Sequence, residues 1–164
     1  MISGAITAYR AAEYVAALGA HAARVITVQT PNAMRLISPL DLARIPGNHV
    51  VESYFDPQIQ PRPQPGPVVF APCSFNSLNK LAAGISDNLA LAITAEMIGY
   101  GQRVVVGISV NPPLFAHPVV RQSIATLRSW GVRVVEPRDV GQGLTLAPTD
   151  VVVNELSFPP SSND

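Results

Sequence analysis

The side chains best suited to bind a ligand gather in one short stretch, where Ser74, Asn76 and Ser77 lie within four residues. An apolar run ends just before them at Ala71, and apolar residues at helical spacing follow from Leu78. This pattern predicts a strand, a polar loop and a helix. In an open parallel sheet such a loop lies at the carboxyl edge, where ligands bind. Hydroxyl and backbone N–H groups at a helix start suit a phosphate or a polar ring edge, although helix capping alone would also explain them.

Several well-known catalytic patterns are missing from the chain. It has no Gly-rich phosphate loop ending in Lys-Ser or Lys-Thr and no Gly-x-Gly-x-x-Gly fingerprint. A single cysteine, Cys73, and three scattered histidines at positions 21, 49 and 117 give no metal-ligand spacing, so no metal is expected. Cys73 has no histidine near it in the sequence, and a packed free thiol is the simpler interpretation.

Composition limits the classes of protein to which the chain can belong. It has 164 residues, 48% of them apolar and 13% charged, with a formal net charge of zero. One domain with a real core is expected, and no basic patch indicates a nucleic-acid partner. No apolar run approaches the roughly 20 residues of a membrane span, and no signal-peptide pattern opens the chain, so a cytoplasmic protein is expected. The low charge content favours subunit interfaces.

Strands and helices alternate along the chain. Buried strands are predicted at 25–28, 68–71, 101–108 and 132–135, with helices after them. This order predicts an α/β fold, a Rossmann-like (flavodoxin-like) doubly wound parallel sheet in three layers. Only two residues precede the turn at Ser3, so the first strand is expected to be short or missing.

Polar residues followed by proline mark two further helix starts. Thr30 precedes Pro31 and Ser38 precedes Pro39, so each is predicted to cap a helix. Residues 57–67 carry five prolines and are expected to be an extended loop, either an exposed connection or a flap near the ligand-binding edge. We divide the chain into a domain at 1–140 and a C-terminal extension at 141–164, whose last residues are expected to be disordered.

Three motifs carry a resemblance to a known family. Residues 72–77, Pro-Cys-Ser-Phe-Asn-Ser, resemble the Pro-Ala-Ser-Ala-Asn-Thr motif of the homo-oligomeric flavin-containing cysteine decarboxylases. Residues 4–10 are similar to the opening Gly-Ser-Ile-Ala-Ala-Tyr-Lys of that family. Residues 111–118 resemble its Asn-x-x-Met-Trp-x-His-Pro segment. The match runs in order from residue 3 to residue 137.

The resemblance implies that the protein binds FMN and self-associates as a trimer or a dodecamer of trimers. The FMN phosphate is expected near the first turn of the chain and the hydroxyl of Thr30, with the flavin lined by the loop after residue 71. The expected cofactor-binding residues are Gly4, Ala5, Ile6, Thr30, Ser38, Ser74, Phe75, Asn76 and Ser77.

The family reaction oxidises a cysteine thiol to a thioaldehyde, after which the carboxylate leaves as CO2. The resemblance assigns Asn111 to the substrate carboxylate, and Asn76, which is expected to line the flavin, is the second catalytic candidate. The family's active-site histidine is absent, because the proline-rich segment 57–67 occupies its region. The family's Pro-x-Met-Asn reads Ile-Ser-Val-Asn at 108–111.

These departures favour a substrate other than phosphopantothenoylcysteine. We therefore expect oxidative decarboxylation of the C-terminal cysteine of a ribosomally made peptide, giving an enethiol. One alternative is a catalytically silent, FMN-binding regulatory subunit. Others are an enzyme like phosphopantothenoylcysteine decarboxylase or one like the flavin prenyltransferases, although residues 109–115 do not match the charged phosphate site of the prenyltransferases.

Overall fold

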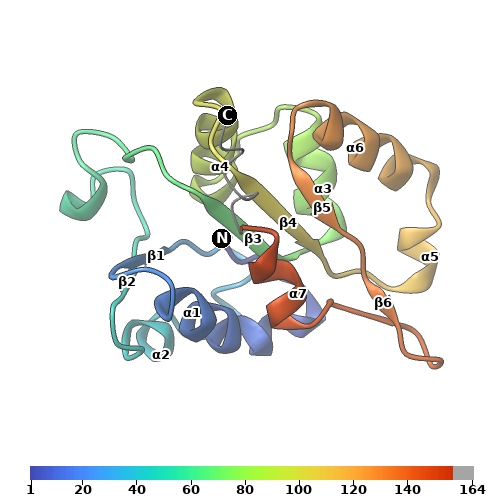
Figure 1. Cartoon of the computed structure of the whole chain (residues 1–164), viewed down its shortest axis with the longest axis horizontal. Helices are drawn as coiled ribbons and strands as arrows, with labels where there is room; N and C mark the ends of the chain where they lie inside the picture. The colour runs from blue at the N-terminus through green and yellow to red at the C-terminus, as the bar shows by residue number, and fades with distance from the viewer. Residues whose placement is uncertain (157–164) are drawn as a thin grey trace, which may run out of the picture.

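A parallel sheet runs through the middle of the protein, of which the computed structural model describes residues 1–156 (Figure 1). On one side, β1 (Val25–Thr27) pairs with β2 (Asn48–Val50). On the other, β3 (Val68–Cys73), β4 (Val104–Ile108) and β5 (Arg133–Val135) pair in that order. All these pairings are parallel, as the alternation of strands and helices predicts.

Residues 1–3 join the two halves of the sheet. Ile2 bridges to Gln29 in parallel, and its N–H donates to the carbonyl of Val28 at 3.0 Å. On the opposite side, the N–H of Ser3 donates to the carbonyl of Pro72 at 3.0 Å. The first strand is therefore present but very short, and the spatial order is β2, β1, residues 1–3, β3, β4, β5.

Helices cover both faces of the sheet, which confirms the predicted doubly wound fold (Figure 1). The face with α1 (Ala11–Gly19) also carries α7 (Thr149–Asn154). The other face carries α3 (Phe75–Ala82), α4 (Leu89–Gly99) and α6 (Pro118–Ser129). A parallel sheet needs cover on both faces because its strands are apolar throughout.

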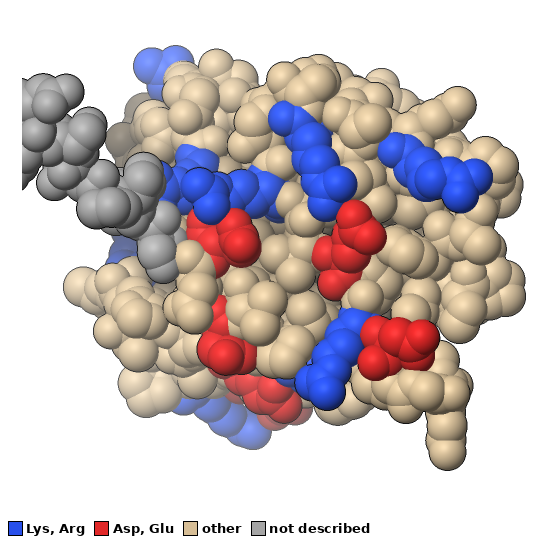
Figure 2. Space-filling model, turned by 45° about the vertical axis from the view of Figure 1, so that its right-hand side comes forward, with Lys and Arg blue, Asp and Glu red and all other residues tan. Residues whose placement is uncertain are grey.

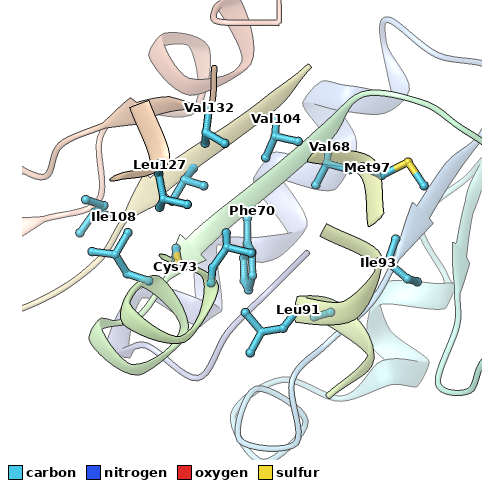
Figure 3. Packing of buried hydrophobic residues seen from close by; sticks show 14 of the residues in the cluster. Val68, Phe70, Cys73, Leu91, Ile93, Met97, Val104, Ile108, Leu127 and Val132 are labelled. Atoms are coloured by element: carbon cyan, nitrogen blue, oxygen red, sulfur yellow. The ribbon is translucent and has the colours of Figure 1, made fainter. Parts of the chain in front are cut away.

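Strand β3 shows how the two cores are separated. Every residue of β3 is buried, and side chains from Val68 to Ala71 point alternately to opposite faces of the sheet. A register shift between Phe70 and Cys73 brings Cys73 back to the face of Phe70. Phe70 and Cys73 lie with Leu91 and Met97 in the core under α4 and α6 (Figure 3). Ala71 lies in the second core, which contains Tyr14, Leu146 and Val152.

Local structure departs from the sequence-based expectations in a few places. A 3-10 helix, η1 (Ile6–Arg10), precedes α1. The helix predicted after Thr30 is only a series of turns over residues 31–36, whereas α2 (Pro39–Ala43) begins after Ser38 as predicted. The proline-rich segment is not extended throughout, because η2 (Pro57–Ile59) forms there with Asp56 as its cap. A short helix, α5 (Pro112–Phe115), follows β4.

The described part of the C-terminal extension packs against the sheet. It contains a small hairpin of β6 (Arg138–Asp139) and β7 (Leu144–Thr145) and then α7. The Arg10 side chain donates to the carbonyl of Leu146 at 3.0 Å, and the Tyr14 hydroxyl donates to the carbonyl of Ala147 at 2.8 Å. The domain boundary at residue 140 stays a prediction, and the predicted disorder at the end of the chain concerns residues 157–164, outside the described residues.

Much of the surface carries no charge. Figure 2 shows charged side chains in small separate groups, with wide uncharged areas between them. Several large apolar side chains are exposed, among them Ile6 at 90% and Phe55 at 87%. None of the helices in residues 1–156 is long and apolar enough to cross a membrane.

The buried Tyr14 hydroxyl makes stability depend on pH at the alkaline end. Burial raises the pKa of Tyr14 to about 12 from the ordinary value of 10.0, with Arg10 opposing part of the shift. The native state therefore holds this proton more tightly than the unfolded state. The stabilisation is complete below pH 10 and is lost as the pH rises toward 12, with a fall of about 2 kcal/mol in the free energy of unfolding.

Urea denaturation of the wild type and of Tyr14→Phe across this pH range measures the effect. The difference between the two proteins should shrink as the pH rises through the window. Tyr9→Phe, at an exposed tyrosine, is the matched control and should follow the wild type. A wild-type curve that parallels Tyr14→Phe would contradict the assignment.

Candidate functional site

A cleft of about 600 Å³ opens at the carboxyl edge of the sheet. It lies where residues 1–3 and β3 are neighbours, which is the point at which the strand order reverses. Open α/β sheets bind ligands at this point, and the volume falls within the range of roughly 300–1,000 Å³ for small-molecule sites. The lining comes from four stretches, 4–6, 30–32, 74–77 and 109–111, together with Lys80, Asp87, Asn88 and Leu114.

The hydroxyl of Ser3 fixes the two central stretches to each other. Ser3 is fully buried, and its Oγ donates to the carbonyl of Pro72 at 2.9 Å. The same Oγ accepts the N–H of Ser74 at 2.7 Å. The first turn of the chain and the start of α3 are therefore held together through one atom.

Gly4 allows the first turn to touch the loop after β1. A Cβ at Gly4 would lie 2.6 Å from Cβ of Asn32 and 2.9 Å from its carbonyl carbon, so no larger residue fits. The neighbouring Ala5 N–H turns back to the carbonyl of Ser3 at 2.8 Å. The N–H groups of Gly4 and Ile6 donate to no acceptor within residues 1–156 and remain for a ligand.

Thr30 lies almost fully buried on the other side of this contact. Its N–H donates to the carbonyl of Ile2 at 2.9 Å, and its Oγ1 accepts weakly from the N–H of Ala33 at 3.4 Å. The hydroxyl proton of Thr30 is then free to donate into the cleft, which the residue lines.

The loop after β3 both caps α3 and faces the cleft. Ser74 Oγ accepts the N–H of Ser77 at 3.4 Å and donates to its hydroxyl at 3.3 Å. Capping of α3 therefore engages the Ser74 hydroxyl and the Ser77 N–H. Other N–H groups in the first turn of a helix have no partner within the helix and can serve a ligand. Asn76 is exposed in this first turn. Phe75 packs its ring edge-on to His117, with ring centroids 5.7 Å apart.

Asn111 begins α5 at the far wall of the cleft. Its Oδ1 accepts the N–H of Leu114 at 3.0 Å, which leaves the two N–H bonds of Nδ2 for a ligand. Ser109, two residues earlier, is buried, and its hydroxyl shares a 2.7 Å hydrogen bond with Thr7. This bond joins the loop after β4 to η1.

The structure brings nearly all of the expected site residues to this cleft. Ser38 is the exception, because its hydroxyl accepts the N–H of Leu40 at 3.2 Å and it does not line the cleft. Those that line it are Gly4, Ala5, Ile6, Thr30, Ser74, Phe75, Asn76, Ser77 and Asn111.

Residues 57–67 do not form a flap over the cleft of their own chain, so this prediction is wrong. This segment leads into the amino end of β3, opposite the cleft, and contributes no lining residue. Sequence reasoning also passed over Ser3, Lys80 and Asn88. Only Asn88 had a clear signal, as a polar cap before the apolar α4.

Cys73 and His117, the other side chains that could react, do not line the cleft. Cys73 is buried in the core, and this burial raises the pKa of its thiol, as fits a packed cysteine. His117 caps α6 through Nδ1, which accepts the N–H of Val119 at 3.2 Å. Within residues 1–156 no histidine lines the cleft, and no group of histidine, cysteine or acidic side chains could hold a metal ion.

Comparison with known proteins identifies the family. The family model described as Flavoprotein matches residues 1–156, and the chain belongs to this family. A protein of Streptococcus mutans described as a probable phosphopantothenoylcysteine decarboxylase is 29% identical, over 94% of this chain and 93% of that protein. The chain also matches the bifunctional coenzyme A biosynthesis protein CoaBC of Haemophilus influenzae, at 26% identity over 92% of this chain and 40% of that protein. It therefore spans about two fifths of the length of relatives of this kind.

Solved structures share the fold. The peptidyl-cysteine decarboxylase EpiD superposes with a TM-score of 0.76 at 22% identity, covering 94% of each chain. The FMN-dependent cysteine decarboxylase TvaF, from thioviridamide biosynthesis, gives a TM-score of 0.65 at 25% identity, over 83% of this chain and 86% of the other. The resemblance to flavin-containing cysteine decarboxylases and the Rossmann-like fold are both confirmed.

The close approach at Gly4 predicts a cost for any side chain there. Gly4→Ala forces the loop at Asn32 to move and should lower the free energy of unfolding by about 1–3 kcal/mol. Gly99→Ala is the matched control, because an added Cβ there meets no atom within 4 Å. At the end of α4 it should leave stability unchanged or raise it slightly. Equal urea midpoints for the two variants would contradict the close contact.

Proposed function

We propose that the cleft binds FMN and that the protein uses it to decarboxylate the C-terminal cysteine of a peptide. The observation that carries the proposal is the convergence of hydroxyl, amide and N–H donors from four separate stretches at one edge of the sheet. Membership of the flavoprotein family supports the cofactor. The cysteine decarboxylases among the structural neighbours support the reaction class.

The residues present fit an FMN phosphate and a flavin ring. The N–H groups of Gly4 and Ile6, with the Thr30 hydroxyl, offer donors at one end of the cleft. Several such donors can hold a phosphate without an arginine. At the other end, Ser74 and Ser77 offer hydroxyl groups to the polar edge of a flavin. Ser38 is not assigned to the cofactor here, because it does not line the cleft.

FMN, when bound, accepts the two electrons removed from the thiol-bearing carbon of the substrate. The protein's own part is to hold the substrate in place. Asn111 Nδ2 donates to the substrate carboxylate, since its Oδ1 is engaged in capping. Asn76 lies in the same lining and orients the reacting end of the substrate. The carboxylate then leaves as CO2, and its bonding electrons pass to the thiocarbonyl group formed by the oxidation.

The charges of the cleft favour a peptide over a phosphorylated substrate. Among the described lining residues, Lys80 is the only cation, and Asp87 already pairs with it. A dianionic phosphate on the substrate would therefore meet at most one lysine, shared with Asp87, to balance its two charges. A peptide ending in cysteine brings only one carboxylate.

An enzyme like phosphopantothenoylcysteine decarboxylase is the second candidate. The relative from Streptococcus mutans, which this chain matches over nearly its full length, favours it. A silent FMN-binding subunit is the third, favoured by the absence of a histidine from the described lining. The experiment below separates all three.

Self-association, as a trimer or a dodecamer of trimers, belongs to the same proposal. Ile6 lines the cleft and exposes 90% of its surface, and Tyr9 on the same 3-10 helix exposes 70%. A second copy packed there would cover these side chains and close the open side of the cleft.

The test is to incubate FMN-loaded protein with peptides ending in cysteine and, separately, with phosphopantothenoylcysteine. We expect the peptide to lose about 46 Da, the mass of CO2 plus two hydrogens. Loss from phosphopantothenoylcysteine alone would support the second candidate. Full FMN loading without any mass change would support the silent subunit, and failure to bind FMN would overturn the proposal.

Asn111→Asp tests the assigned carboxylate contact without breaking the cap. The new carboxylate still accepts the N–H of Leu114, but it loses the Nδ2 donors and repels the substrate carboxylate. We expect kcat/KM to fall about 100-fold or more while FMN content stays unchanged. Asn154→Asp, exposed at the end of α7, is the control. Wild-type turnover in Asn111→Asp would remove Asn111 from the mechanism.

The missing histidine predicts the pH dependence of turnover. With no imidazole in the described lining, and with the one lining carboxylate, Asp87, paired with Lys80, we expect the substrate thiol to lose its proton to solvent. A cysteine thiol has an ordinary pKa of about 8.5, so kcat/KM should rise about tenfold per pH unit below that value and level off above it. A profile that is already flat at about pH 7 would indicate that a base of the protein acts.

A further inference from the structure

One ion pair stands alone in the otherwise neutral lining of the cleft. Nζ of Lys80, on α3, contacts Oδ2 of Asp87, just before α4. The two side chains are 28% and 48% exposed, and both line the cleft. Lys80 lies one turn beyond Ser77, so both residues are on the same side of the helix.

Asp87 is held independently of Lys80. Its other oxygen, Oδ1, accepts from Nδ2 of Asn88 at 3.1 Å. Asn88 is itself fixed, because its Oδ1 accepts the N–H of Leu91 at 3.2 Å and caps α4. If Lys80 moved away, Asp87 would keep this donor and its contact with water.

Lys80 has the opposite character. Its ammonium group sits on a flexible four-carbon stem and can reach a range of positions. A ligand carboxylate that enters the cleft loses part of its hydration shell. A hydrogen bond from a positively charged donor compensates this loss better than one from a neutral donor. Asn111 supplies only neutral donors to it.

Building on the proposed function, we propose that Lys80 recognises the carboxylate of the ligand by exchanging Asp87 for it. The ligand class is a peptide or small molecule ending in a free carboxylate. Asp87 holds the ammonium ready and competes with the ligand, which keeps the contact weak. This weakness matters, because a strong ion pair would stabilise the carboxylate before it leaves and would slow its loss as CO2.

The exchange predicts opposite effects for the two partners. Lys80→Met, which keeps the length and removes the charge, should weaken carboxylate binding about tenfold. Asp87→Asn removes the competitor, keeps the hydrogen-bonding shape and should tighten carboxylate binding severalfold. If the proposed decarboxylation occurs, Asp87→Asn should lower both KM and kcat. An ion pair with only a structural role would give losses of the same sign in both variants.

The binding test uses two unreactive pentapeptides that end in serine, one with a free carboxylate and one with a carboxamide. Each is titrated into the protein with and without FMN, and Kd is measured by calorimetry. We expect the wild type and Lys80→Arg to prefer the carboxylate about tenfold, Lys80→Met to lose this preference and Asp87→Asn to increase it. Thermal unfolding of each variant checks that it is folded.

Equal affinity of the wild type for the two peptides would overturn the proposal, as would a preference that survives in Lys80→Met. Equal losses in Lys80→Met and Asp87→Asn would make the pair structural. These outcomes are separable from the proposed function, because the peptides cannot react. A Lys80-dependent preference without decarboxylation of any cysteine peptide would overturn the proposed reaction and leave this inference standing.

Discussion

The buried hydroxyl of Ser3 is the contact on which the rest of the site depends. It bridges the carbonyl of Pro72 and the N–H of Ser74, so the first turn of the chain and the start of α3 share one atom. Without it, the N–H of Ser74 would lose its partner, and the carbonyl of Pro72 would keep only the N–H of Ser3, at the point where the strand order reverses. The close contact at Gly4 and the donors of α3 both follow from this fixed spacing, because each needs the two strand ends side by side.

The sequence was enough to predict the architecture and most of the cleft. Strand runs such as 68–71 and 104–108 are apolar on both faces, which is typical of a covered parallel sheet, and the polar residues after them fall at its carboxyl edge. The proline-rich segment was misplaced, since a loop signal does not say at which end of the sheet the segment lies. Ser38 follows Ile37, whose carbonyl accepts from the Gln29 side chain just after β1, but it caps α2 and does not line the cleft. Ser3 and Lys80 gave no local signal at all, because their roles come from contacts with Ser74 and Asp87 that only the folded chain creates.

The lining of the cleft carries almost no formal charge. Hydroxyl, amide and N–H groups provide the donors, and the single ion pair of Lys80 and Asp87 is neutral as a unit. Such a lining can hold one phosphate at helix and turn N–H groups, and Lys80 is the only cation among the described lining residues that it offers to a second anion. Charged side chains are also sparse on the surface, and exposed apolar residues such as Ile6 border the cleft.

The most direct test of this account is a crystal structure of the protein saturated with FMN. We expect the phosphate within hydrogen-bond distance of the N–H groups of Gly4 and Ile6 and of the Thr30 hydroxyl. The flavin ring should lie against residues 74–77. A flavin bound elsewhere, or crystals of the folded protein that take up none at saturating concentration, would contradict the central claim that the edge between residues 1–3 and β3 is the cofactor site.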